Sequence, residues 1–384
     1  MKQSLGMDYL LYIDPSITSR FFRDVRFKLS HYFSGVREKH LLNNVNVKEN
    51  VTFRVINKTT LKLDVCSPKK KGNYPIIVFI HGGGWMKGSK DKGTNERVAM
   101  LLASYGYVVF NIDYRLSPTE IIHDPLKPHE HPTIREMVTD VRSAMKFALE
   151  NGASYGGDTE NLFLFGRSAG AHLALLTAYS LDEPFYNDGQ DNFTLENSPI
   201  TSVIAFYPIT DLKELHEFYD DINPLRVALL SGTGGKLEEN VNLYKLFSPI
   251  EYVHKDTACC LPPVFLVAGK YDRIVDVYQS EELSEELTKF DIPNVYLEFP
   301  WANHAFDLIL AGPGGQLAIK YMTQFLVWSI SRKKLKEIEQ IAQEVGLHDV
   351  VSTEKMKRLH QMKNKRTDEI LAELSNLVEP NVIE

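Results

Sequence analysis

Cysteine is scarce in this sequence. Its 384 residues contain three cysteines, Cys66, Cys259 and Cys260, and no two of them form a C-x-x-C pair. An odd number of cysteines without paired spacing predicts neither a disulfide framework nor a thiolate zinc site. A chain without disulfides fits a reducing compartment, so we expect a cytoplasmic protein.

The sequence also lacks an excess of positive charge and any long apolar run. Lys and Arg number 43 against 50 Asp and Glu, a net charge of −7. We therefore expect no nucleic-acid partner, because such binding depends on neutralising phosphates. No run is long enough for a membrane span, and residues 1–14 lack the cleavage site of a secretory signal. With 43% hydrophobic and 24% charged residues, the composition is globular and compatible with a small neutral substrate.

Short apolar runs alternate with amphipathic segments along most of the chain. Residues 46–66 predict two strands around a turn at 57–60. Later runs are apolar throughout, as in strands buried on both faces, and lie at 76–80, 108–112, 162–165, 203–206, 264–267 and 295–299. Helical spacing occurs at 134–149, 169–179, 276–290 and 315–331. The alternation predicts an α/β protein with a mostly parallel central sheet and helices on both faces.

We divide the chain into three parts. A catalytic domain is predicted at residues 46–332, after an N-terminal helical packing segment at 1–45. Irregular stretches at about 181–200 and 211–262 are expected to form a cap, because insertions at the strand ends of such a sheet usually shape the binding crevice. Residues 333–384 contain no Trp, Tyr or Phe and predict a helical appendage, either packed on the core or used to form a homo-oligomer.

Aromatic and basic residues mix in the N-terminal part, at residues 15–42. Phe21, Phe22, Val25, Leu29 and Phe33 follow a helical spacing. A helix packed over the main domain is the interpretation we favour. A membrane-surface helix with basic flanks is the alternative, so membrane association remains a second hypothesis.

The strongest motif is Gly166-Arg167-Ser168-Ala169-Gly170, between an apolar strand and an apolar helix. In a nucleophile elbow, a serine on a tight strand-to-helix turn exposes its hydroxyl, and small flanking residues let the turn close. The helix N-terminus then favours negative charge nearby. The pattern predicts Ser168 as a nucleophile, although a purely structural glycine-rich turn would give the same letters.

A second glycine-rich motif, His81-Gly82-Gly83-Gly84-Trp85, directly follows the strand at 76–80. Successive glycines let backbone N–H groups turn toward one point, because no Cβ interferes. Acyl transfer needs such donors for the oxyanion of its tetrahedral intermediate. We assign this role to the amides of Gly82 and Gly83, together with that of Ala169.

A serine nucleophile needs a base and an orienting acid. His304 follows the last predicted strand and lies C-terminal to the serine, in the Ser…Asp…His order of such enzymes. Asp272 follows the strand at 264–268 closely and is our choice of acid, which would hold the productive tautomer of the imidazole. Asp276 is the second choice and is expected to cap the next helix.

On these motifs the chain resembles the α/β-hydrolase superfamily, and more narrowly the carboxylesterases related to hormone-sensitive lipase and bacterial acetyl esterases. The residues that carry the resemblance are His81–Trp85, Asp113–Pro118, Gly166–Gly170, Asp272 and Pro300–Phe306. It implies the α/β-hydrolase fold, serine-esterase activity and no cofactor. It also implies the triad Ser168, Asp272 and His304, with an oxyanion hole formed by Gly82, Gly83 and Ala169.

The chain departs from the family pattern in two positions beside the serine. Many relatives have Asp where this chain has Arg167, and Gly where it has Ala171. We expect both at the floor of the site, which leaves the substrate preference open. The segment beyond Arg332 has no counterpart in the minimal family pattern.

A zinc site is a hypothesis that the sequence argues against. Its candidate ligands are His123, Asp124, His129, Glu130 and His131. They lie in a proline-rich segment, and no HExxH spacing occurs. We therefore predict no metal and expect a polar loop at the rim of the crevice.

Two tryptophans flank the predicted catalytic loops, Trp85 and Trp301. They could line an acyl pocket or pack in the core, and the sequence does not decide between the two. We expect a serine carboxylesterase that hydrolyses short- to medium-chain esters of small molecules through an acyl-enzyme. The alternatives are an arylformamidase-like amide hydrolase and a non-catalytic ligand-binding protein on a hydrolase fold.

Overall fold

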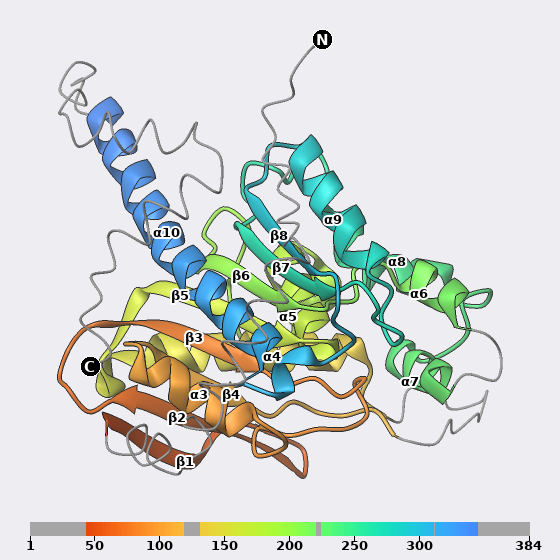
Figure 1. The fold of residues 1–384 in the computed structure, drawn as a ribbon, viewed down its shortest axis with the longest axis horizontal. Coiled ribbons are helices and arrows are strands. Elements are labelled where there is room, and N and C mark those ends of the chain that lie inside the picture. Colours follow the sequence, from red (N-terminus) through yellow and green to blue (C-terminus); the bar gives the residue numbers. More distant parts are fainter. Residues whose placement is uncertain (1–43, 119–130, 220–223, 311, 345–384) are drawn as a thin grey trace.

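The computed structural model describes residues 44–118, 131–219, 224–310 and 312–344. The predicted N-terminal helix at 15–42 lies outside these residues, as does most of the predicted C-terminal appendage. The described part contains one twisted sheet with helices on both faces (Figure 1).

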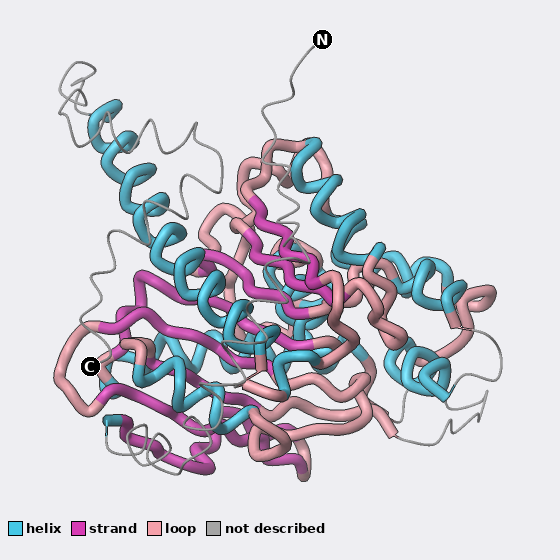
Figure 2. Tube along the Cα trace, viewed as in Figure 1, coloured by secondary structure: helices cyan, strands magenta, loops and turns pink. Residues whose placement is uncertain are grey.

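Eight strands form the sheet, in the order β1-β2-β4-β3-β5-β6-β7-β8 (Figures 1 and 2). From β4 to β8 the neighbouring strands are parallel, whereas β1 pairs with β2, and β2 with β4, in the antiparallel sense. The bounds are β1 Val45–Ile56, β2 Thr59–Pro68, β3 Tyr74–Ile80, β4 Val108–Ile112, β5 Gly157–Arg167, β6 Ile200–Phe206, β7 Val264–Gly269 and β8 Asn294–Phe299. The mostly parallel sheet predicted from the apolar runs is confirmed.

Helices cover both faces of the sheet (Figure 1). On one face α4, α5 and α9 share a hydrophobic core with the strands, and on the other α3 and α10 do so. Three further helices, α6, α7 and α8, lie beyond one edge of these layers. The bounds are α3 Asn95–Ser104, α4 Ile134–Asn151, α5 Ala169–Tyr179, α6 Leu212–Phe218, α7 Pro224–Thr233, α8 Val241–Leu246, α9 Tyr278–Lys289 and α10 Pro313–Glu344.

Strand β3 shows why the central runs are apolar throughout. Side chains alternate between faces along a strand. Ile76, Val78 and Ile80 pack under α4 and α5, whereas Ile77 and Phe79 pack under α3 and α10. All five are fully buried. Each contributes about 1.5–3 kcal/mol of transfer free energy, so neither face tolerates a polar substitution.

Two helix ends follow their local sequence. At the start of α4, the Glu136 carboxylate accepts hydrogen bonds from the Thr133 amide at 2.9 Å and the Thr133 hydroxyl at 2.7 Å. This contact holds the first turn. Helix α10 begins near the predicted residue 315 but does not end at 331. It runs on to Glu344, because the sequence after Arg332 has no glycine or proline before Gly346. The boundary expected after residue 332 is therefore not a break in the helix.

The stretches expected to form a cap hold α6, α7, α8 and two short 3-10 helices, Pro184–Tyr186 and Pro249–Tyr252. The hydroxyl of Tyr219, at the end of α6, donates to the carbonyl oxygen of Ile274 at 2.5 Å. Gln279 of α9 donates to the Asp211 carbonyl oxygen at 3.0 Å. Side-chain hydrogen bonds thus attach α6 to the loop after β7 and to α9.

Candidate active site

The strand-to-helix turn after β5 holds Ser168 in a strained conformation. Its φ of 52° and ψ of −122° lie outside the regions that residues with a side chain usually adopt. Such strain costs on the order of 1–3 kcal/mol and must be held by the surroundings. The Ser168 amide donates to the carbonyl oxygen of Phe206 at 2.9 Å, which ties the turn to the end of β6.

Glycine is required on both sides of this serine. A Cβ on Gly166 would lie 2.1 Å from the carbonyl oxygen of Gly170. A Cβ on Gly170 would lie 2.2 Å from the carbonyl oxygen of Ile80, at the end of β3. Both distances are far below contact, so the turn closes only with hydrogen at these positions. The expectation that small residues let the elbow close fits this geometry.

Ser168, His304 and Asp272 meet at the carboxyl ends of three parallel strands. His304 Nε2 lies 3.0 Å from Ser168 Oγ, and His304 Nδ1 lies 2.6 Å from Asp272 Oδ2. Because the carboxylate is an acceptor only, Nδ1 carries the hydrogen and Nε2 is free to accept from the serine hydroxyl. The side chains of His304 and Asp272 are only 9% and 1% exposed, so little water competes for these bonds.

Backbone amides fix the carboxylate of Asp272. Its second oxygen, Oδ1, accepts from the amides of Ile274 and Val275, each at 2.9 Å. The neighbouring Asp276, our second choice for the acid, instead accepts from the Tyr278 amide at 3.0 Å at the start of α9. The two carboxylates therefore have different partners, and only that of Asp272 contacts His304.

Asn303 joins the loop that carries the acid to the loop that carries the base. Its Oδ1 accepts from the His304 amide at 2.8 Å and from the Arg273 amide at 3.2 Å. The Tyr271 amide also donates to the Ala302 carbonyl oxygen at 2.9 Å. No sequence motif indicates Asn303, because its contacts depend on two loops that are distant along the chain.

The glycine-rich loop after β3 lies directly against the elbow. A Cβ on Gly82 would be 2.7 Å from the Arg167 carbonyl oxygen and 3.3 Å from Ser168 Cβ. Gly83 has a φ of 135°, and a Cβ there would be 2.0 Å from the Lys87 carbonyl oxygen. Within the residues that the structure describes, the amides of Gly82, Gly83 and Ala169 donate no hydrogen bond. That these amides form an oxyanion hole beside Ser168 stays a prediction.

Buried histidines support this loop. Tyr114 stacks on His81 with ring centroids 4.3 Å apart and donates to the His81 carbonyl oxygen at 2.9 Å. His172 of α5 accepts from Trp85 Nε1 at 3.2 Å and donates from Nε2 to the Phe247 carbonyl oxygen at 2.7 Å. Burial lowers the pKa of both histidines to about 4. Both are thus neutral near pH 7 and hold the loop by directed hydrogen bonds.

The two tryptophans that flank the loops differ in exposure. Trp85 is 2% exposed and packs edge-on against His172, with ring centroids 5.3 Å apart. Trp301 is partly exposed and stacks on Phe299 at 5.5 Å. Core packing therefore accounts for Trp85 in the structure. A role of either ring in binding an acyl chain stays a prediction.

The residues beside the serine that differ from the family pattern are both buried. Arg167 is 2% exposed and forms an ion pair with the fully buried Asp307, so it does not line the floor of the site as expected. Ala171 packs inside the core that α5 shares with the sheet. Of the zinc-ligand candidates, only His131 is among the described residues, and those residues hold no group of three metal-binding side chains.

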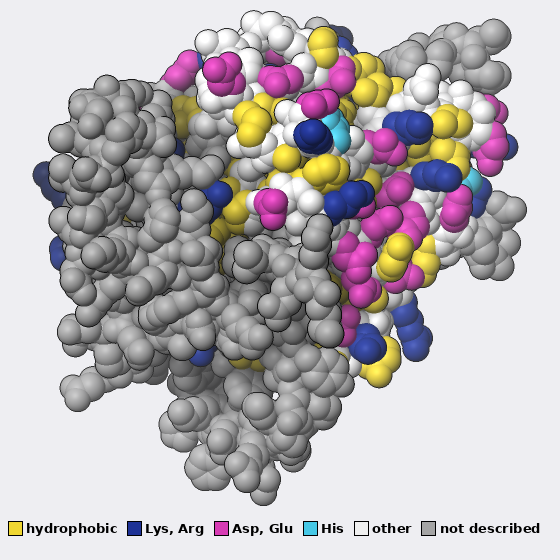
Figure 3. Space-filling model, turned by 90° about the horizontal axis from the view of Figure 1, so that it is seen from above, with side chains coloured by type: hydrophobic (Ala, Val, Ile, Leu, Met, Phe, Trp, Pro, Cys, Tyr) yellow, Lys and Arg dark blue, Asp and Glu magenta, His cyan; other side chains and the backbone are white. Residues whose placement is uncertain are grey.

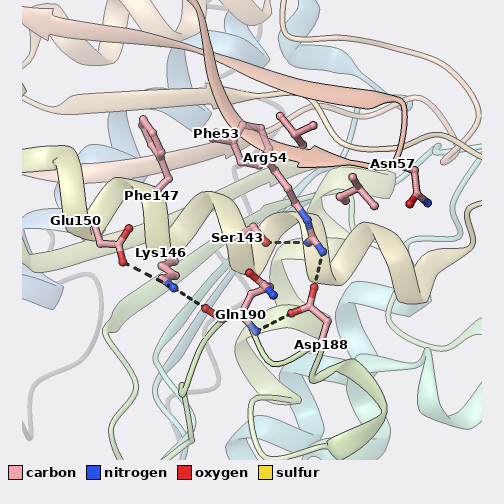
Figure 4. A pocket seen from close by; sticks show the side chains of 11 residues that line it. Phe53, Arg54, Asn57, Ser143, Lys146, Phe147, Glu150, Asp188 and Gln190 are labelled. Carbon is pink, nitrogen blue, oxygen red and sulfur yellow. Dashed lines mark hydrogen bonds and ion pairs between the residues drawn. The ribbon is translucent and has the colours of Figure 1, made fainter.

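A pocket of about 640 Å³ lies between the end of β1, helix α4 and the segment after Tyr186 (Figure 4). Arg54 reaches across it to Ser143 Oγ at 2.7 Å and forms an ion pair with Asp188. Lys146 Nζ donates to a backbone oxygen of the same segment. The pocket's charges are satisfied by one another, and none of the three triad residues lines it.

Acidic side chains gather where α6 meets α9, and Figure 3 shows acidic residues grouped on one part of the face that it displays. Burial and the charges of Glu282, Asp211 and Asp276 raise the pKa of Glu214 from its ordinary 4.5 to about 7. Gln279 Nε2 donates to Glu214 Oε2 at 2.7 Å and partly offsets this effect. The contact between cap and core therefore contains a carboxyl group that titrates near neutral pH.

The fold and family follow from comparison with known proteins. A family model described as BD-FAE matches residues 63–287, more than half of the chain. The chain is 29% identical over 258 residues to "Probable carboxylic ester hydrolase LipM" of Mycobacterium tuberculosis, covering 66% of this chain and 54% of that protein. It is 27% identical to the isoprenylcysteine alpha-carbonyl methylesterase ICME of Arabidopsis thaliana, covering 66% of this chain and 55% of that one. The chain thus spans about half the length of these relatives.

Solved structures support the same fold. Esterase B of Lactobacillus rhamnosis superposes with a TM-score of 0.60 over 84% of this chain and 99% of its own, at 21% identity. Among the described residues, no helix is both long and apolar enough to cross a membrane. The α/β-hydrolase fold and the resemblance to carboxylesterases expected from the motifs are confirmed, and the chain belongs to the BD-FAE family.

Proposed function

We propose that this protein is a serine hydrolase of carboxylic esters. The observation that carries the proposal is the hydrogen-bonded series Ser168 Oγ, His304 Nε2, His304 Nδ1 and Asp272 Oδ2, with separations of 3.0 and 2.6 Å. A nucleophile within reach of a base that an acid orients is the arrangement that activates a serine hydroxyl. The names of the relatives, which include a carboxylic ester hydrolase and a methylesterase, favour esters as substrates.

In the first half-reaction, Ser168 Oγ attacks the ester carbonyl carbon while His304 Nε2 takes the hydroxyl proton. The carbonyl oxygen becomes an oxyanion, and the amides of Gly82, Gly83 and Ala169 donate to it. The carbon–oxygen bond to the alcohol then breaks, and His304 protonates the leaving alcohol. Asp272 stabilises the imidazolium while it exists, and an acyl-enzyme on Ser168 remains.

In the second half-reaction, water takes the place of the alcohol. His304 removes a proton from the water as it attacks the acyl carbon, and the same amides stabilise the second oxyanion. When this intermediate collapses, His304 returns the proton to Ser168 Oγ and the carboxylic acid is released. Because proton transfer through one imidazole serves both halves, the proposed chemistry needs no metal or cofactor.

We infer small esters with a short- to medium-chain acyl group as substrates. Helix α7 of the cap packs closely over the oxyanion loop, where a Cβ on Gly84 would lie 3.4 Å from Ala228 Cβ. On the same helix, a Cβ on Gly232 would lie only 3.3 Å from the ring of Trp85. This close packing of the cap on the loop that follows β3 supports a short- to medium-chain acyl group.

A fluorophosphonate probe and a series of p-nitrophenyl esters of increasing chain length test the proposal. Wild-type protein should be labelled on Ser168 and hydrolyse the short esters, whereas Ser168→Ala should lose labelling and on the order of 10⁴- to 10⁶-fold in kcat. The matching anilides should be turned over more slowly than the esters. Folded wild-type protein that neither takes up the probe nor cleaves any ester would contradict the proposal.

Location and assembly are the remaining parts of the proposal. All three cysteines are free thiols, which supports a reducing, cytoplasmic compartment. Helix α10 extends past the sheet that it covers (Figure 1), which supports self-association through residues 333–384. Sedimentation of the full chain should give an oligomeric mass, and a chain cut after residue 344 should give a lower one if residues 345–384 contribute. A monomeric mass for both the full chain and the shortened chain would contradict the proposed self-association.

A further inference from the structure

The residue next to the nucleophile carries a buried charge that the reaction does not use. Arg167 is 2% exposed, directly precedes Ser168 and forms an ion pair with Asp307. Its Nη1 also donates to Thr94 Oγ1 at 3.0 Å and to Asn95 Oδ1 at 3.2 Å. These contacts hold the guanidinium inside the fold, away from solvent.

The partner of this arginine belongs to the loop that carries the base. Asp307 is fully buried and lies three residues after His304, in the 3-10 helix Phe306–Leu308. The ion pair therefore joins the backbone beside the nucleophile to the backbone beside the base. A buried ion pair adds little net stability compared with an apolar pair of similar size, because both charges must be desolvated. Stability alone does not explain a pair at this position.

Tyr207 extends the contact to the imidazole itself. Its hydroxyl donates to Asp307 Oδ1 at 2.5 Å, and its ring centroid lies 4.5 Å from that of His304, at an angle of 59°. Its amide donates to the Val267 carbonyl oxygen at 2.6 Å, which anchors it to β7, the strand that leads to the acid. Burial, with the charge of Asp307 second, raises the pKa of Tyr207, so the hydroxyl stays a donor.

We propose that Arg167, Asp307 and Tyr207 form a buried bridge of positioning residues that holds the His304 imidazole in line with Ser168. The proposal rests on the hydrolytic function assigned above. The ion pair sets the distance between the elbow and the base loop, and the tyrosine ring limits rotation of the imidazole. Rotation of His304 would lengthen its 3.0 Å contact with Ser168 Oγ, which the first proton transfer requires.

Tyr207→Phe tests the link to the imidazole, with Tyr186→Phe as the matched control. Both variants remove one buried tyrosine hydroxyl that makes a short hydrogen bond, at 2.5 Å to Asp307 and at 2.6 Å to the Leu246 carbonyl oxygen. Tyr186 lies in the 3-10 helix Pro184–Tyr186 and contacts neither His304 nor Ser168. The readouts are kcat, KM on p-nitrophenyl butyrate, the rate of fluorophosphonate labelling and the thermal midpoint.

Tyr207→Phe should lower kcat and the labelling rate by roughly 10- to 100-fold with KM unchanged, the cost of a small misplacement of a reacting group. Tyr186→Phe should keep both rates, although its thermal midpoint should fall by about as much as that of Tyr207→Phe. The bridge is refuted if Tyr207→Phe keeps the wild-type kcat and labelling rate. It is also refuted if Tyr186→Phe lowers kcat and the labelling rate as much as Tyr207→Phe does. Wild-type protein that resists the probe would instead refute the hydrolytic function, so the two failures are distinguishable.

The double variant Arg167→Met, Asp307→Leu separates positioning from folding. Replacing both charges with apolar groups of similar size avoids leaving one charge buried without a partner, so the thermal midpoint should fall less than in either single variant. The kcat should still fall at least as far as in Tyr207→Phe, because the tyrosine loses its acceptor. A stable double variant with wild-type kcat and labelling rate would overturn the proposal.

Discussion

The triad region and the cap are held in different ways. Around Ser168 the backbone itself is packed to contact, so that a Cβ on Gly166, Gly170 or Gly82 would lie 2.1 to 2.7 Å from a carbonyl oxygen. The cap is attached by side-chain hydrogen bonds such as that of Tyr219 to Ile274. Its Gly189 has no atom within 4 Å of a Cβ position.

The difference shows where the sequence is constrained. Backbone-to-backbone contacts at the strand ends leave no choice of residue, and they hold the nucleophile turn against the end of β3 and the glycine-rich loop. Side-chain contacts at the cap can be replaced by other pairs of similar reach. The proposed chemistry thus depends on the sheet ends, and the cap is a region where residues can change without disturbing them.

The largest effect that distinguishes the two regions is expected for Asp272→Asn. The amide keeps the oxygen that accepts from Ile274 and Val275, but it cannot accept from His304 Nδ1 as a carboxylate does. The imidazole then loses its productive tautomer, and kcat should fall by roughly 10⁴-fold. Ester hydrolysis under saturating substrate measures the change, and circular dichroism checks that the fold persists.

Asp276→Asn is the matched control, four residues away on the same loop. Its carboxylate accepts from the Tyr278 amide at the start of α9 and does not contact the base. Activity should stay at the wild-type level. Equal losses in both variants would mean that the loop as a whole, and not one carboxylate, supports the reaction.

A smaller effect, on stability, is expected for Gly170→Ala. The new methyl group would lie 2.2 Å from the Ile80 carbonyl oxygen, so β3 and α5 must move apart. We expect a loss of about 2–4 kcal/mol in the free energy of unfolding. Gly232→Ala in α7 of the cap places a methyl group 3.3 Å from the Trp85 ring and should change stability by less than about 1 kcal/mol. Urea unfolding of both variants measures the difference, and equal losses would remove the contrast between the regions.

Much of the site could be predicted from local sequence because its parts follow strands. Each triad residue and the glycine-rich loop come directly after a buried apolar run, and parallel strands bring their carboxyl ends to one edge. The order of Ser168, Asp272 and His304 along the chain then left few alternatives. The strand-to-helix turn at Ser168 was visible because steric closure demands glycine at two fixed positions.

The remaining features depend on contacts between distant residues. Asp307 and Tyr207 are 100 positions apart, and no periodicity or motif announces that they meet. In the sequence, Arg167 stands out only as a departure from the family pattern, and its buried ion pair with Asp307 has no local signal. The full length of α10 could not be predicted for a different reason: the change of composition after Arg332 resembles a domain boundary, but helix propensity is high on both sides of it.

The smallest effect concerns the acidic contact between α6 and α9. Because the pKa of Glu214 is about 7 in the folded protein and near 4.5 when unfolded, the native state binds the proton more tightly. Stability is then lost as the pH rises from about 4.5 to about 7. Glu214→Gln removes this loss, so the variant should match wild type near pH 4 and exceed it above pH 8. The gain should be about 1 kcal/mol, because water screens the partly exposed carboxylate.

Glu217→Gln on the same helix provides the comparison. Glu217 is exposed and its partner is Lys213 at 4.0 Å, an i,i+4 pair that contributes little. Its substitution should leave the dependence of stability on pH unchanged, and neither variant should alter kcat at pH 8, since Glu214 does not contact the triad. If Glu214→Gln raised the free energy of unfolding equally at pH 4 and pH 8, ionisation of Glu214 would not be what destabilises the folded protein. The attachment of the cap would then not depend on the charge of Glu214, and the contrast between the two regions would rest on the glycines alone.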